Sequence, residues 1–92
     1  MALIHNNVTV GTTPTQILQM PNGVGYVASQ IFNNDSAAIF IGDAQVDKAN
    51  PGIGLKLAAG ASVQIWLHGN DQLYAISSAG TSSGAVAVVY SA

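Results

Sequence analysis

The most constraining feature of this sequence is a series of turn-forming clusters with only short apolar runs between them. The clusters combine Gly, Pro, Asn, Asp, Ser and Thr, and they lie at residues 11–14, 21–23, 33–36, 50–52, 59–60, 69–71 and 80–84. Strands of about four to eight residues fit between such turns. No segment has the pattern of a long amphipathic helix, and strand-forming residues are abundant whereas Lys, Glu and Arg are almost absent. This spacing favours an all-β sandwich or barrel.

We predict eight short strands, at residues 4–10, 15–20, 25–32, 37–42, 54–57, 61–68, 73–78 and 85–90. Polar and apolar residues alternate most clearly in segment 61–68, where Val63, Ile65 and Leu67 share the expected core face. Residues 1–92 are therefore predicted to form one small antiparallel β-sandwich, either jelly-roll-like or immunoglobulin-like. Residues 1–7 are a candidate N-terminal arm, because termini are often ordered only by a partner.

Ionised side chains are scarce along the whole chain. Charged residues make up 7% of the sequence and apolar residues 49%, whereas an average soluble domain has about 25% charged residues. The surface must consequently be neutral and partly apolar, and such a surface favours association. We expect other protein chains to cover much of it, the alternative being a monomer with a neutral surface.

Several classes of partner are disfavoured by this composition. Two Lys and no Arg against four Asp cannot supply the phosphate contacts of a nucleic-acid-binding protein. The same shortage disfavours a polybasic membrane contact, and no apolar run approaches the roughly 20 residues that span a bilayer. The first residues lack the basic and apolar regions of a secretory signal. With no cysteine, the chain has neither disulfides nor thiolate metal ligands.

Catalytic or metal-binding chemistry is not predicted, and neither is a cofactor. The four Asp fall in predicted turns or loops, where Asp commonly bends the backbone for structural reasons. Asp43, Asp47 and Asn50 share one loop and could offer oxygens to Ca²⁺, but their spacing is not that of an EF-hand, and a solvated loop is favoured. His5 and His68 form no motif.

The predicted interface residues are Trp66, His68 and Phe40, which lie opposite the expected core faces of their strands. An outward Trp provides a large contact area at a small cost in entropy, and it often anchors a partner. Packing within the chain and stacking on a sugar ring remain the alternatives for Trp66.

Part of the sequence resembles the small virion proteins of tailed bacteriophages, over a little more than half of the chain. The resemblance lies in the order and spacing of residues 31–36, 38–42 and 73–78, of Gly52, Leu57 and Gly60, and of Gly80-Thr81. It implies a β-sandwich on the phage particle, most simply a capsid decoration (cement) protein. Such a protein would be a homo-oligomer, with a trimer favoured, bound to the major capsid protein on the capsid surface. A tail or fibre component with a receptor- or glycan-binding role is the alternative.

Overall fold

The computed structural model describes residues 3–21, 23, 25–46, 54–77 and 79–91, and every regular element in that part of the chain is a strand. Eight strands occur, one for each predicted segment, with ends that differ by a few residues. They are β1 (Leu3–Val8), β2 (Thr15–Gln19), β3 (Val27–Asn33), β4 (Ile39–Gly42), β5 (Leu55–Leu57), β6 (Ser62–Leu67), β7 (Gln72–Ser77) and β8 (Val86–Ser91). The predicted all-β class is confirmed.

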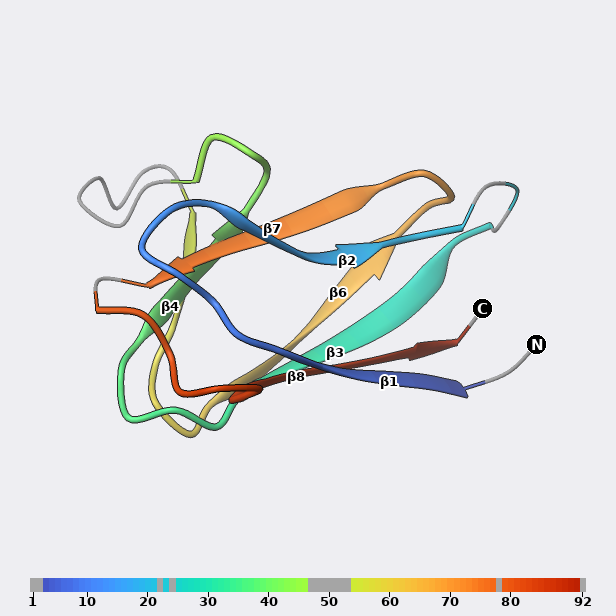
Figure 1. Ribbon diagram of the computed structural model, residues 1–92. Coiled ribbons are helices and arrows are strands. Elements are labelled where there is room, and N and C mark those ends of the chain that lie inside the picture. The colour runs from blue at the N-terminus through green and yellow to red at the C-terminus, as the bar shows by residue number, and fades with distance from the viewer. Residues whose placement is uncertain (1–2, 22, 24, 47–53, 78, 92) are drawn as a thin grey trace.

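The strands form two antiparallel four-stranded sheets that face each other (Figure 1). Sheet A has the order β1-β8-β3-β6, and sheet B has the order β2-β7-β4-β5. The first four strands pair with the last four as in one long hairpin, through the pairs β1–β8, β2–β7, β3–β6 and β4–β5. The additional pairs β3–β8 and β4–β7 fold this hairpin into two sheets. This is the connectivity of a jelly roll and not of an immunoglobulin sandwich, whose sheets have a different order.

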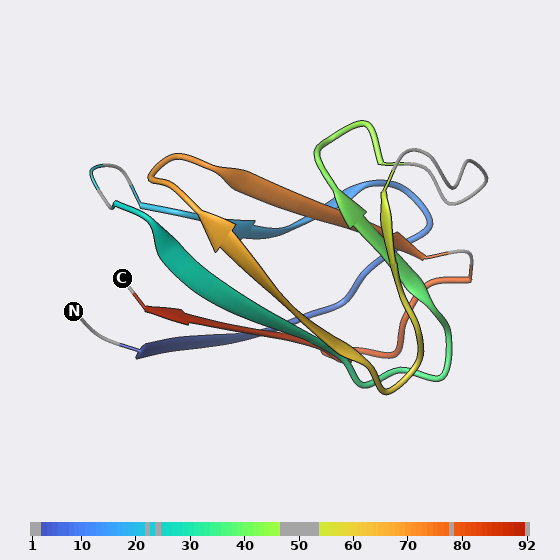
Figure 2. The same ribbon diagram turned by 180° about the vertical axis from the view of Figure 1, so that it is seen from behind.

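The core lies between the two sheets, as the alternating pattern predicts (Figure 2). Along β3, Val27, Ser29, Ile31 and Asn33 are buried, while the residues between them are half-buried. The same alternation is seen on β4 and β8, where Ile39 and Ile41 and also Val86, Val88 and Tyr90 are buried. Val63 and Ile65 pack against the core but stay half-buried, since β6 is an edge strand.

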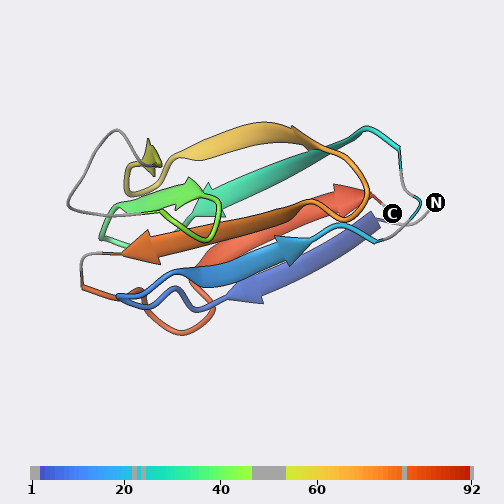
Figure 3. The same ribbon diagram turned by 90° about the horizontal axis from the view of Figure 1, so that it is seen from above.

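The candidate N-terminal arm is, from Leu3 onward, an integral strand of sheet A. β1 pairs with β8 along its full length, from Leu3 opposite Ser91 to Val8 opposite Val86. The two chain ends consequently lie side by side at one end of the sandwich (Figure 3). Among the described residues, β1 has β8 as its neighbour on one side and no paired strand on the other.

A buried asparagine joins the turns at the opposite end of the sandwich. Asn33 is fully buried, and its Nδ2 donates to the carbonyl oxygens of Ala37 (2.9 Å), Leu57 (3.0 Å) and Ala58 (3.3 Å). Its Oδ1 accepts a hydrogen bond from the Asp35 N–H at 3.1 Å. One side chain therefore links the β3–β4 turn to the chain between β5 and β6.

Candidate interaction surface

Three aromatic side chains gather at one end of sheet A. Trp66 on β6 is 60% exposed, and Tyr26, just before β3, is 64% exposed. Their ring centroids are 6.1 Å apart in an edge-to-face arrangement, and the Tyr26 ring lies 3.8 Å from that of His68. We call Tyr26, Trp66 and His68 the aromatic cluster. Two of its members, Tyr26 and Trp66, are of the residue types that dominate protein contacts.

The structure brings together two of the three predicted interface residues and separates the third. Trp66 and His68 belong to the aromatic cluster, whereas Phe40 lies in β4 of the other sheet. Phe40 is half-buried, opposite Ile76 on one side and Lys56 on the other. The outward orientation predicted for all three is compatible with their exposure, but the three do not form one patch.

Tyr26 is the member of the cluster that sequence reasoning missed. The β3–β6 register pairs Val27 with Leu67, so the residues just beyond them, Tyr26 and His68, meet across the strand ends. The two positions are far apart in the sequence, and the register between β3 and β6 is not a local property. The sequence showed only that Tyr26 is an aromatic residue close to the turn cluster at residues 21–23.

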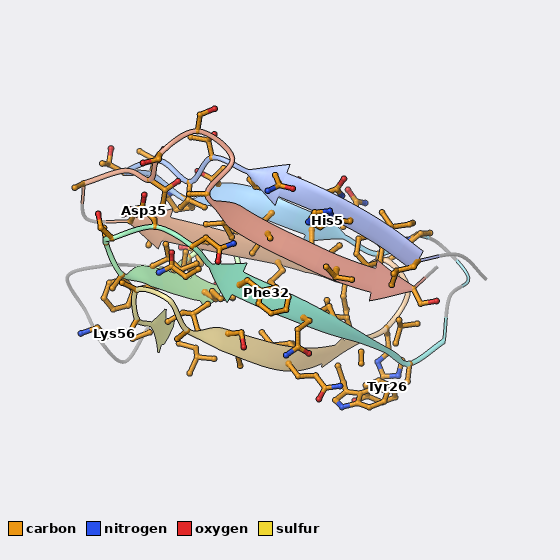
Figure 4. The ribbon with its side chains drawn as sticks, turned by 90° about the horizontal axis from the view of Figure 1, so that it is seen from below. His5, Tyr26, Phe32, Asp35 and Lys56 are labelled. Carbon is orange, nitrogen blue, oxygen red and sulfur yellow. The ribbon has the colours of Figure 1, made fainter. Side chains whose placement is uncertain are left out.

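The outer face of sheet A contains no Asp, Glu, Lys or Arg on its paired strands. Alternation and register place these side chains in three cross-strand rows. Two rows cross all four strands, Asn7-Ala87-Phe32-Ser62 and His5-Val89-Gln30-Gln64, and the third consists of the pairs Leu3–Ser91 and Ala28–Trp66. Figure 4 looks onto this face, with Phe32 over β3, Tyr26 at one end, and Asp35 and Lys56 at the other. A surface of this kind can approach another protein without burying unpaired charge.

The acidic side chains Asp35, Asp43 and Asp71 lie in turns and accept hydrogen bonds from backbone N–H groups. Asp35 accepts hydrogen bonds from the Ser82 N–H (2.9 Å) and the Ala37 N–H (3.0 Å), and these donors, Ser82 first, hold the pKa of Asp35 below its ordinary value. Asp71 accepts from the His68 N–H at 2.7 Å, and Asp43 accepts from the Gln45 N–H at 2.8 Å.

The described residues give no support to a metal site. In the parts of the chain that the structure describes, no three His, Cys, Asp or Glu side chains come together as a metal site would require. Of the loop considered for Ca²⁺, Asp47 and Asn50 lie outside the described residues. His5 lies in β1 and His68 beyond the end of β6, at opposite edges of sheet A.

Residues 80–84, Gly-Thr-Ser-Ser-Gly, match the Gly-x-Ser-x-Gly spacing of a nucleophile elbow. In hydrolases this motif lies on a sharp turn between a strand and a helix. Here the segment connects two strands, β7 and β8, and the N–H of its central Ser82 is bonded to Asp35. The local geometry is that of a connecting loop, so the motif adds no argument for catalysis.

The chain matches no protein-family model, and no curated protein or solved structure is significantly similar to it. Among the described residues, no helix is long and apolar enough to span a membrane. The comparisons therefore assign no function to the chain.

Proposed function

We propose that this protein is a structural component of a bacteriophage virion, a capsid decoration protein that self-associates and binds the major capsid protein. The observation that carries the proposal is the outer face of sheet A, which lacks ionised residues and ends in the exposed aromatic cluster. Such a surface suits contacts with protein more than contacts with phosphate or a charged substrate. The sequence resemblance to small virion proteins supports the phage particle as the place where this contact is made.

A decoration protein requires surfaces for adhesion and has no need of catalytic groups. Bound in many symmetric copies, it can stabilise a shell through contacts that are individually modest. A trimer is the oligomer that the resemblance favours, and the capsid surface is the corresponding location. In this role the protein needs neither a cofactor nor nucleic acid.

The direct test is binding to capsid shells of the phage that encodes the chain. Purified protein is mixed with shells stripped of it, and the shells are pelleted. We expect the protein to co-sediment in a fixed ratio to the major capsid protein and to raise the temperature at which the shells rupture. Protein that stays in the supernatant at every concentration, with shells of unchanged stability, would contradict the proposal.

The alternative is a tail or fibre component that binds a glycan, and one observation favours it. Tyr26 and Trp66 are exposed aromatic rings, and the uncharged Gln64 lies on the same strand and face as Trp66. Aromatic rings can pack against the C–H face of a sugar while amides bond to its hydroxyls. A change of Trp66 fluorescence on titration with oligosaccharides would support this role, and a blank glycan array with folded protein would remove it.

A further inference from the structure

Within the part of the chain that the structure describes, the outer edge of β6 pairs with no other strand. β6 pairs there with β3 alone, and it runs along one border of the molecule (Figure 3). The Asn33 N–H donates to the Ala61 carbonyl oxygen at 2.9 Å. Since hydrogen-bonded pairs alternate in antiparallel sheets, Val63 and Ile65 direct their backbone groups toward β3. The N–H and C=O groups of Ser62, Gln64 and Trp66 therefore point away from the sheet.

The two sheets differ in how their edges are protected against pairing with another chain. In sheet B, β2 is interrupted by a register shift between Gln16 and Leu18, and β5 has only three residues and carries Lys56. Bulges, short strands and lysines are the usual means of blocking an edge. β6 has six residues in continuous register with β3, and it contains neither charge nor proline. This edge thus lacks the features that prevent strand addition.

We propose that β6 pairs in antiparallel orientation with β6 of a second copy, around a twofold axis at Gln64, to form a continuous eight-stranded sheet. The inference rests on the proposed function for its biological setting, and it deepens that function by naming the contact through which copies associate. A second copy is the occupant because the pairing is self-complementary in its backbone, its side chains and its charge.

One register of the β6–β6 pair satisfies both the free backbone groups of the edge and the inward and outward orientation of the side chains. A twofold axis perpendicular to the sheet keeps outward residues outward, so Gln64 lies opposite Gln64 of the second copy, and Ser62 lies opposite Trp66. These three residues are the ones whose free N–H and C=O groups face the edge. On the inner side the same register places Val63 opposite Ile65 of the second copy. Both side chains are half-buried in the single chain and would be covered.

The bulky residues at one end of β6 and the small residues at its other end are also complementary between the two copies. The aromatic cluster lies at the end of β6, whereas the chain before β6 contains only small residues, Ala58-Ala59-Gly60-Ala61. An added Cβ at Gly60 would meet nothing within 4 Å, so the turn leaves open space. The twofold axis brings the aromatic end of each copy against the small end of the other. With no ionised residue on β6, the symmetry brings no like charges together.

The test uses the full chain with Gln64→Lys, which places two like charges opposite each other at the axis. A twofold contact gives an even number of copies: a dimer, or paired trimers if a trimer contact exists elsewhere. In sedimentation equilibrium at up to about 1 mM protein, we expect Gln64→Lys to halve the particle mass. An equimolar mixture of Gln64→Lys and Gln64→Asp should restore the mass, since the charges are then opposite.

Two matched controls lie in the same cross-strand row. Gln30→Lys adds the same charge to β3, an internal strand, and His5→Lys adds it to β1, the far edge of the sheet. Both should keep the wild-type mass. A second measurement needs no variant: the amide protons of Ser62, Gln64 and Trp66 should exchange more slowly as the wild-type concentration rises.

The inference is overturned if the wild-type chain stays monomeric, if Gln64→Lys keeps the full mass, or if those three amides are never protected. These results are distinguishable from failure of the proposed function. Loss of the β6 contact with retained shell binding would remove only the inference. A β6 dimer that ignores capsid shells would remove only the virion role.

Discussion

Asn33 shows how one buried polar residue can fix two connections at once. Its side-chain amide donates to three carbonyl oxygens from two different parts of the chain and accepts from the Asp35 N–H. Leaving a buried carbonyl oxygen without a hydrogen-bond donor lowers the free energy of unfolding by about 1–3 kcal/mol. Loss of these bonds is therefore expected to destabilise the fold by more than the small net contribution of a typical hydrogen bond. In the sequence Asn33 is only a member of a turn cluster; the structure makes it a central link between the sheets.

Asn33→Asp tests this role with almost no change in shape. The carboxylate cannot donate, and it would face carbonyl oxygens in a buried site, so we expect a loss of about 3 kcal/mol in the free energy of unfolding at neutral pH. Asn34→Asp is the matched control, because Asn34 is exposed and changes charge equally. The control should stay within about 0.5 kcal/mol of wild type. Equal effects in urea unfolding of the two variants would refute the role of Asn33.

At the scale of elements, Asp35 ties two loops that are distant in the sequence. It follows β3, and its carboxylate accepts from the N–H of Ala37 in its own turn and from that of Ser82 between β7 and β8. The pKa of Asp35 is lowered by these donors, the Ser82 N–H first. The ionised form is thus favoured in the folded state, and the contact stabilises the fold more when Asp35 is ionised than when it is protonated.

The sign of the pH dependence follows from that lowered pKa. The contribution of Asp35 is fully present above its ordinary pKa of about 4 and is lost as the pH falls through the lowered folded value. Asp35→Asn should therefore reduce the change in thermal midpoint between about pH 5 and pH 2. Asp43→Asn is the control, since Asp43 bonds only within its own turn among the described residues. A wild-type-like acid profile in Asp35→Asn would argue against the link.

For the whole molecule, the scarcity of charge and the exposed aromatic cluster make association the property to measure. Trp66→Ala should weaken self-association by about 2 kcal/mol, roughly 30-fold in the dissociation constant. Because Trp66 is 60% exposed, the thermal midpoint of the dissociated chain should change little. Light scattering and thermal unfolding are run in parallel, with Leu55→Ala, another exposed apolar residue, as the control. Unchanged assembly with a large fall in midpoint would make Trp66 a packing residue.

Local pattern predicted more of the fold than of the surface. The two-residue alternation placed Val63, Ile65 and Leu67 toward the core, and the turn clusters separated the eight strands. The interface prediction was limited because it used only the pattern within each strand and no information on which strands pair. It identified outward aromatic residues strand by strand, so it grouped Phe40 with Trp66 although the two lie in different sheets.

The sequence by itself determined that the chain is all-β, where each strand lies, and which side of most strands is buried. These properties depend on neighbouring residues, through backbone alternation and turn chemistry. Only the tertiary structure decided on the jelly roll, the meeting of Tyr26 with His68, and the open edge at β6. Those depend on pairing between segments as distant as β1 and β8, and pairing at that range is set by how the two sheets jointly bury their apolar faces.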